Sequence, residues 1–438
     1  MNTPLLTLST PLLTLSTPLL TQSTPLLTQS TPLLTQSTPL LTLSTPYWAG
    51  PRLDPLLPHG GVPYAPNVSV SRIFFATPAN GTYNHMPMLD EHRGTLFAWW
   101  KNSPVDEDQP GQRILYSQSN DGISWISAEE LFPNMSSAAH HAALFAEPML
   151  HLNGSAYIAA SPIQFNVYPI SDKAPGLGRE TLLLRQVMPG LRQFGPTFWA
   201  TPSIPPGFAD ASAAHGVRTL DQMPETVQSD MALLSNVAVR PCPDPKTSGN
   251  WKCEACTDGC WAPPNASDDS NEFTHYEVPG GRGDVILYRR RAAQLSKLSL
   301  AASVREPGGH WTPPVPINIS DDNSNLNAGI LPDGRVYLLS NAMPFAFRDP
   351  LFLSTSVDGQ AFGATARALT SCQLAVYQSP HQPSGCVYRH KGGSKQGGVQ
   401  YPQGLALTVQ GLEGFWAIYS LNKEDVWVAR APFRGIPY

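Results

Sequence analysis

The chain of 438 residues carries 33 acidic and 28 basic side chains, a formal net charge of −5 at pH 7. This balance lacks the basic surface by which proteins bind nucleic acids or anionic membranes, so both partner classes are set aside. Charged residues make up only 14% of the chain and prolines number 45, which favours many short strands over long surface helices. No apolar run reaches the ~18–20 residues that a membrane-spanning helix requires.

The first predicted element is a low-complexity segment at residues 1–50. A seven-residue unit, Thr-Pro-Leu-Leu-Thr-Leu/Gln-Ser, fills residues 3–44 in consecutive copies. A period of seven is typical of coiled coils, but the proline in every unit removes a helical hydrogen bond each time. We therefore expect this segment to be disordered or extended, outside the fold.

From about residue 67 a longer repeat begins, in which a glycine turn leads into a strand of alternating apolar residues. Copies of this unit stand at Gly94–Trp100, Gly154–Ala159, Gly283–Tyr288, Gly334–Leu339 and Gly414–Tyr419. Each is typical of a hairpin turn followed by a strand rich in β-branched and aromatic residues. The apolar run at residues 229–240 predicts a further strand pair, which brings the expected number of sheets to six.

A shorter motif links two of these sheets. Ser119–Trp125 recurs, in related form, as Ser356–Phe362, and each copy follows a strand-like run. In both, Asp-Gly supplies a tight turn and the aromatic residue is placed to pack beneath it. A hairpin that recurs at long intervals indicates repeated sheets, and such sheets closed in a ring form a propeller. We predict an all-β fold, a six-bladed β-propeller over residues 67–435.

The cysteines fall in two groups. Cys242, Cys253, Cys256 and Cys260 crowd into a loop insertion at 241–264, and Cys372 and Cys386 bracket a second segment. Clustered, even-numbered cysteines predict local disulfides in an oxidising compartment, while the spacing in the first group leaves a zinc site open. Glycosylation sequons at Asn67, Asn80, Asn134, Asn153, Asn265 and Asn318 also favour the secretory pathway, although residues 1–50 lack the pattern of a signal peptide.

The two turn motifs resemble the Asp-boxes of the sialidase superfamily, which consists of six-bladed propellers. The resemblance spans roughly residues 67–435. It implies that the Asp-boxes lie on the outer rim and take no part in catalysis. It also implies a glycoside-cleaving site with a Tyr nucleophile polarised by a Glu, an Asp acid/base and three arginines that bind a carboxylate.

Matches to these family positions follow residue by residue. Tyr401, before the last apolar strand, matches the nucleophile, and Glu277, before a glycine-turned strand that ends in arginines, matches its partner. The acid/base falls in the run Asp106-Glu107-Asp108, with Asp106 and Asp108 both open. Carboxyls this close raise one pKa by mutual repulsion, which suits an acid at neutral pH. Arg348 matches a carboxylate-binding arginine.

The chain departs from the family at the first arginine. Where the family has Arg-Ile-Pro, this chain has His85-Met86-Pro87, and histidine has no guanidinium fork for a carboxylate. Corresponding positions in other blades add His141, Glu147 and Asn327 as candidates for substrate binding. The charged pair Lys423-Glu424, after the final strand and close to a predicted inner edge, adds two more, and each of these residues has a structural alternative as a turn, core or surface residue.

The resemblance implies an exo-acting glycoside hydrolase on a terminal acidic sugar, with a glycan as partner and with no cofactor or metal. Two alternatives stay open. The first is a polysaccharide lyase or deoxy-sugar hydrolase that uses His85 and a tyrosine. The second is a non-catalytic propeller that binds glycans. The sequence does not indicate an oligomeric state.

Overall fold

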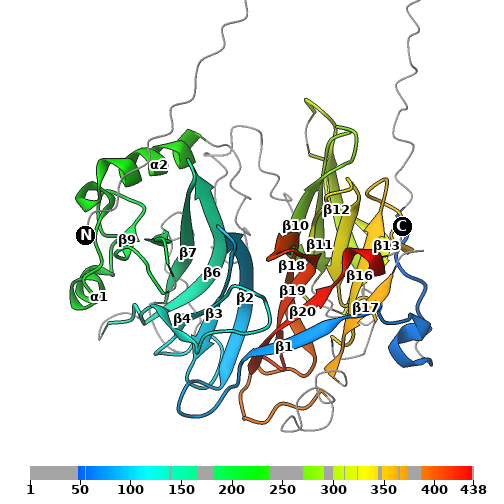
Figure 1. Ribbon diagram of the computed structural model, residues 1–438, viewed down its shortest axis with the longest axis horizontal. Helices are drawn as coiled ribbons and strands as arrows, with labels where there is room; N and C mark the ends of the chain where they lie inside the picture. Colours follow the sequence, from blue (N-terminus) through cyan, green and yellow to red (C-terminus); the bar gives the residue numbers. More distant parts are fainter. Residues whose placement is uncertain are drawn as a thin grey trace, which may run out of the picture. The chain divides into compact units, whose positions relative to one another are not determined.

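A computed structural model of the chain describes residues 48–436, apart from 55, 138–140, 166–181, 191, 237–269, 291–298, 310, 323, 344–347, 364–365 and 373–385. The seven-residue repeat at 3–44 and the cysteine-rich insertion at 241–264 therefore lie outside the described residues, and their predictions stay untested. Five four-stranded antiparallel sheets make up most of the described chain (Figure 1).

Four of the sheets are meanders of consecutive strands. The first holds β2 (Tyr83–His92), β3 (Thr95–Ser103), β4 (Arg113–Ser119) and β5 (Glu129–Phe132). The second holds β6 (His141–Leu152), β7 (Ser155–Phe165), β8 (Leu183–Gln186) and β9 (Phe198–Trp199). The third holds β10 (Ser270–Glu277), β11 (Asp284–Arg290), β12 (Ser299–Arg305) and β13 (Val315–Ser320). The fourth holds β14 (Asn327–Ile330), β15 (Val336–Ser340), β16 (Leu351–Ser356) and β17 (Arg367–Thr370).

The last sheet joins the two ends of the described chain. It contains β18 (Val399–Val409), β19 (Leu412–Leu421) and β20 (Asp425–Ala431), and β1 (Ser69–Phe74) pairs with β20 at its edge. The pairing runs from Ser69 opposite Arg430 to Phe74 opposite Val426. An antiparallel partner from the other end of the chain removes an exposed sheet edge.

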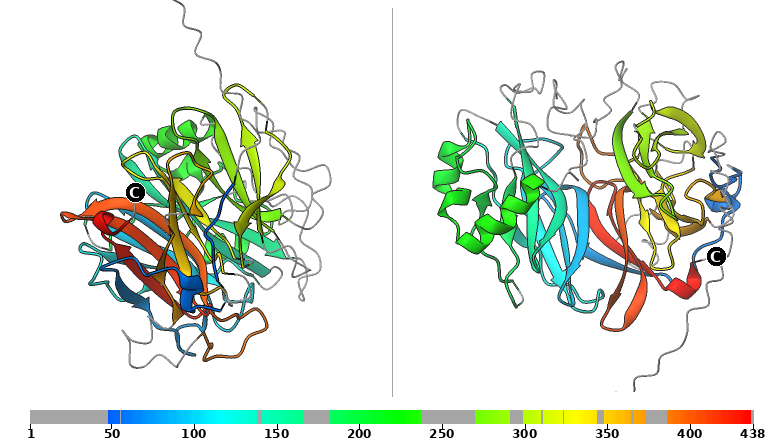
Figure 2. Two further views of the ribbon diagram at one scale, coloured as in Figure 1. Left: turned by 90° about the vertical axis from the view of Figure 1, so that its right-hand side faces the viewer. Right: turned by 90° about the horizontal axis from the view of Figure 1, so that it is seen from above.

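The first strands of the five sheets lie next to one another, in the order β10, β14, β18, β2 and β6 (Figure 2). Apolar side chains fill the layers between neighbouring sheets; Trp99 and Ile158 lie in one such cluster, and Leu339 and Phe415 in another. This arrangement of sheets side by side, with their first strands innermost, confirms the predicted all-β propeller.

The predicted strand pair at 229–240 is wrong for its described part. Residues Glu225–Asn236 form α2, which follows the short α1 (Ala209–Ala214) in the chain between β9 and β10. Val227 and Met231 are four residues apart, so both fall on one helical face, where they are buried with Tyr157 and Phe198. The apolar run has the period of a helix at its start, and this outweighs its strand-like composition. Short 3-10 helices lie at Pro58–Gly61, Leu220–Gln222 and Phe433–Gly435.

The two Asp-box turns have the predicted geometry. Asp121 Oδ1 accepts the backbone N–H groups of Ile123 at 2.8 Å and Ser124 at 2.7 Å. These backbone donors, Ser124 first, hold the pKa of Asp121 at about 2. Asp358 repeats the arrangement with Gln360 and Ala361, both at 2.8 Å. The turns close the β4–β5 and β16–β17 connections, at the outer side of their sheets.

Gly122 is the position in the first Asp-box turn that tolerates a side chain least. Its φ is 71°, and a Cβ there would lie 2.1 Å from ring carbons of the buried Trp416, in the last sheet. We expect Gly122→Ala to lower the free energy of unfolding by about 1–2 kcal/mol through left-handed strain. Displacement of the indole should cost about 1–3 kcal/mol more.

The matched control is Gly154→Ala, because Gly154 has a φ of 79° and an added Cβ there would meet nothing within 4 Å. Urea unfolding of both variants separates the cost of the left-handed backbone, which both share, from the cost of displacing Trp416, which only Gly122→Ala has. Equal losses of stability in the two variants would show that Trp416 does not hold this turn.

Candidate functional site

Three of the innermost strands contain a bulge at a proline. The residues are Met86-Pro87 in β2, Glu147-Pro148 in β6 and Tyr401-Pro402 in β18, and the pairing register shifts at each. Proline has no N–H for the ladder, so a bulge is where a strand can accommodate it. Met86 and Tyr401 take positive φ values of 49° and 47°. Such bulges redirect side chains out of the regular alternation of a strand.

Tyr401 lies where side chains from several sheets meet. Arg289 of β11 donates from Nη1 to the Tyr401 hydroxyl at 2.8 Å. The His85 ring of β2 is 4.0 Å from the Tyr401 ring, centroid to centroid. Arg348, which precedes β16, has its guanidinium carbon 5.8 Å from the centre of the same ring. A guanidinium that donates to a phenol oxygen stabilises negative charge on that oxygen.

His85 is completely buried, and neither ring nitrogen has a hydrogen-bond partner within the described part of the chain. Burial holds the pKa of His85 well below its ordinary value, and the positive charges of Lys423, Lys101, Arg348 and Arg289 lower it further. His85 is therefore a neutral imidazole at physiological pH, able to donate from one nitrogen and accept at the other.

The four cations that act on His85 form a buried cluster. Lys101, Arg289, Arg348 and Lys423, here called the cation cluster, are at most 7% exposed. Carboxylates accompany the two lysines: Lys101 Nζ lies 2.5 Å from Asp108 Oδ1, and Lys423 Nζ lies 3.3 Å from Glu107 Oε2. All four positive charges nevertheless act on one ring and, after burial, lower its pKa. Such a field, at a place with little water, favours an anionic ligand.

Within the acidic run 106–108, the pKa of Glu107 is lowered rather than raised. Burial alone would raise the pKa of Glu107, but the charges of Lys101 and Lys423 outweigh burial and lower it. Repulsion by its acidic neighbours therefore does not set the pKa of Glu107. The Glu107 carboxylate lies beside Lys101 and Lys423, and the attraction to their charges outweighs its burial.

Two of the predicted residues make contacts away from the cation cluster. The carboxylate of Asp106 accepts the backbone N–H groups of Gly393 and Ser394. Glu424 is buried and accepts the backbone N–H groups of Arg389 at 2.8 Å and His390 at 2.6 Å. Both carboxylates thus bind one segment of the chain, which follows the second group of cysteines.

Glu277 is not brought together with Tyr401. It pairs in register with Asp284 at one end of the β10–β11 hairpin, whereas Arg289, which bonds Tyr401, pairs with Glu272 near the other end. Five residues of strand correspond to roughly 17 Å. The register therefore places Glu272, which the sequence did not single out, beside the arginine that contacts Tyr401.

The remaining predicted residues lie in neighbouring strands. The carboxylate of Glu147 accepts a hydrogen bond from Ser161. His141 Nε2 contacts the backbone oxygen of Asp108 at 2.7 Å. Asn327 joins two sheets, because its Oδ1 accepts from the Tyr337 hydroxyl at 2.9 Å and from the Gly404 N–H at 3.0 Å. His141 thus touches the acidic run, while Asn327 has a packing role.

The structure therefore brings together Tyr401, His85, Arg348, Lys423 and Asp108. It adds Arg289 and Lys101, which the sequence did not single out. Arg289 follows Val285 and Leu287 on the buried face of β11 at intervals of two. This alternation of apolar residues predicts that, within Arg289-Arg290-Arg291, the side chain of Arg289 faces the interior.

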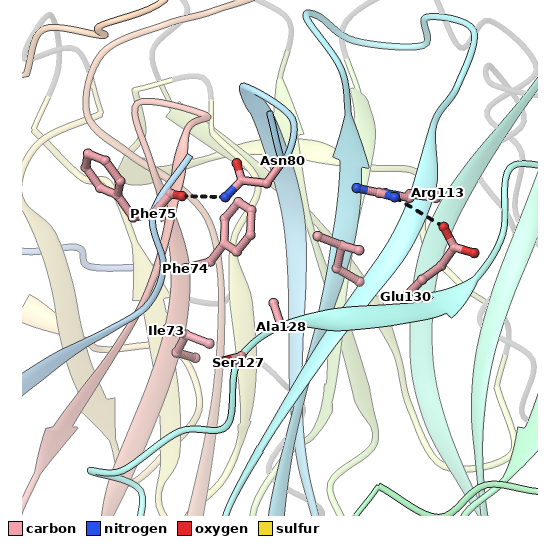
Figure 3. A pocket seen from close by; sticks show the side chains of 9 residues that line it. Ile73, Phe74, Phe75, Asn80, Arg113, Ser127, Ala128 and Glu130 are labelled. Carbon is pink, nitrogen blue, oxygen red and sulfur yellow. Dashed lines mark hydrogen bonds and ion pairs between the residues drawn. The ribbon is translucent and has the colours of Figure 1, made fainter. Parts of the chain in front are cut away.

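A hollow of about 410 Å³ lies elsewhere, between β1 and the outer strands of the β2–β5 sheet (Figure 3). Ile73, Phe74 and Leu115 contribute apolar surface to it, and an ion pair between Arg113 and Glu130, at 3.3 Å, lies at its side. No residue of the cation cluster lines this hollow.

Cys372 and Cys386 form a disulfide, as predicted for local cysteine pairs, which is compatible with an oxidising compartment. The carboxylate of Asp349 lies near both sulfurs. Within the described part of the chain, Asp349, Cys372 and Cys386 form the group of potential metal ligands that lie close enough to share one ion. The disulfide removes the thiolates that a metal would need. Among the described residues no helix is long and apolar enough to cross a membrane.

Asp349, next to Arg348, should make folding stability depend on pH. Burial raises its pKa to about 7, against ~3.9 in an unfolded chain. Between these values the folded state keeps a proton that the unfolded state has lost, so stability falls as the pH rises from ~4 to ~7. We expect Asp349→Asn to flatten this decline, measured by urea unfolding at several pH values. An unchanged slope in the variant would contradict the assignment.

Comparisons with known proteins agree with this architecture. The family model of a BNR repeat-like domain matches residues 246–408, and one of an N-terminal beta propeller matches residues 69–148. No curated protein sequence matches the chain significantly.

Two solved structures illustrate the likeness. A sialidase aligns with a TM-score of 0.65 at 19% identity, over 88% of this chain and 35% of that one, so the chain spans about a third of that protein. The intramolecular trans-sialidase from Ruminococcus gnavus, solved with oseltamivir carboxylate, aligns with a TM-score of 0.50 at 10% identity, over 84% of this chain and 98% of that one. The resemblance to the sialidase superfamily is thus confirmed at the level of the fold.

Proposed function

We propose that the protein is a glycoside hydrolase that cleaves a terminal acidic sugar from a glycan outside the cytoplasm. The observation that carries the proposal is the contact of the Tyr401 hydroxyl with Arg289, inside a buried cluster of four cations. A terminal sugar acid would offer the negative charge that this cluster favours, and its anomeric carbon would lie near the phenol oxygen.

The proposed reaction begins with binding of the sugar carboxylate by Arg289 and Arg348. Tyr401 then passes its phenol proton to a base and attacks the anomeric carbon; the glycosidic bond breaks, and the leaving alcohol takes a proton from the acid/base residue. Water, which gives a proton back to the acid/base residue, then hydrolyses the glycosyl-enzyme and releases the sugar and the Tyr401 phenol. We leave Glu277 out of the role of that base, because its register opposite Asp284 sets it apart from Arg289. For the acid/base we favour Asp108, since the Asp106 carboxylate binds backbone N–H groups.

His85 takes the place of a third arginine in this scheme. A neutral imidazole offers one N–H to the bound acid group instead of a charged fork. The nearby ammonium groups of Lys101 and Lys423 supply positive charge without bidentate geometry. The site therefore suits a carboxylate held through two guanidinium groups.

Replacing the nucleophile tests the proposal. We expect Tyr401→Phe to lower turnover of a fluorogenic aryl glycoside of a nine-carbon sugar acid by roughly 10³-fold or more, because the ring loses its attacking oxygen. Binding of the unsaturated 2,3-dehydro analogue of the sugar, measured by calorimetry, should persist. The control Tyr116→Phe removes a hydroxyl that bonds Glu129 in the β4–β5 pair and should leave turnover intact.

Two outcomes would redirect the assignment. A parent protein that binds the analogue but turns over no acidic glycoside would support a glycan-binding propeller. A Tyr401→Phe variant with full turnover would remove tyrosine from the mechanism.

A lyase acting on a uronic-acid polymer is the second candidate, and one observation favours it. His85 is neutral and in contact with Tyr401, so it could take the proton α to a uronate carboxyl that the cation cluster neutralises. Tyr401 would protonate the departing oxygen, and a C=C bond would form in the product. Lyase products absorb ultraviolet light because this bond is conjugated with the carboxylate, whereas hydrolase products do not.

A further inference from the structure

The segment of residues 389–395, here called the clasp, crosses from the last sheet to the first. Arg389 binds the carboxylate of Asp425 with two nitrogens, at 2.6 and 2.8 Å, at the start of β20. Lys395, at the other end of the clasp, donates to the backbone oxygen of Thr82 at 2.7 Å, just before β2. The clasp therefore joins the two sheets whose first strands carry Tyr401 and His85.

Buried charge fixes the clasp in place. The Lys395 ammonium lies 3.2 Å from Glu424 Oε1, and both side chains are at most 1% exposed. Glu424 also accepts backbone N–H groups from the clasp, so its carboxylate is compensated on several sides. Loss of one partner from such a buried pair is expensive, because the other charge stays out of water.

The clasp also holds the acidic run. Asp106 accepts the backbone N–H groups of Gly393 and Ser394 in the clasp, across 287 and 288 residues of sequence. The next two residues bind elsewhere: Glu107 contacts Lys423, and Asp108 contacts Lys101. Glu107 and Asp108 thus both contact lysines of the cation cluster, whereas Asp106 is attached to the clasp.

We infer that Lys395 and Asp106 are positioning residues, through which the clasp sets where Asp108 stands relative to Tyr401. The catalytic role of Asp108 in this inference rests on the proposed function. The attachment of the acidic run to the clasp does not, and it can be measured without any substrate. Asp106 then acts by placing its neighbour rather than by moving a proton.

The test uses the full chain with Lys395→Met, which removes the ammonium and keeps an unbranched side chain. Hydrogen–deuterium exchange should rise about tenfold or more in the amides of residues 104–112, because their anchor is loosened. Lys391→Met is the matched control, since Lys391 is an exposed lysine of the same clasp, and it should leave this exchange unchanged. Asp106→Asn, which weakens the anchor from the other side, serves where Lys395→Met does not fold.

Where the parent is active, the leaving group gives a second readout. A misplaced acid should slow cleavage of an alkyl glycoside roughly tenfold more than that of an aryl glycoside, whose leaving group needs little protonation. Lys395→Arg should restore part of this loss.

Unchanged exchange at 104–112 in both Lys395→Met and Asp106→Asn would overturn the inference, as would equal losses on the two glycosides. A parent that cleaves no acidic glycoside would count against the proposed function alone, because the exchange measurement still decides on the clasp.

Discussion

The centre of this protein depends on compensation of buried charge. Four cations stand around a neutral histidine and a tyrosine, and taking them out of water would be prohibitive without carboxylates such as those of Glu107 and Asp108. Burial and the charges of these cations together lower the pKa of His85, whose ring lies against that of Tyr401. A polar centre of this kind contributes little to stability by itself, so the apolar layers between the sheets must hold it.

Local features of the fold could be read from the sequence, because their causes are local. The Asp-box turns are formed by side chains that bond amides two or three residues away, and these turns appeared as predicted. The helix α2 was missed because its apolar residues fit both a strand and one face of a helix, and only its contacts with the β6–β9 sheet decide between them. Propensity is weak where tertiary packing decides.

The candidate site could be predicted in part for the same reason. His85 and Tyr401 could be found because each stands at a position that the resemblance to the family marks, within two residues of a proline in an inner strand. Glu277 was chosen from its position before a turn. Strand register decides which residue pairs with Arg289, and register depends on the partner strand rather than on the local sequence. The contacts of Asp106 span nearly three hundred residues, and the sequence around Asp106 contains no pattern that predicts them.

The pairing of β1 with β20 bears on how the molecule can be assembled in the cell. The strand β1 is synthesised well before its partner β20, because Ser69 pairs with Arg430. The strand β1 therefore stays unpaired until the ribosome has released β20. Throughout that interval β1 presents free backbone groups to any neighbouring strand, so early protection by a chaperone would favour correct closure.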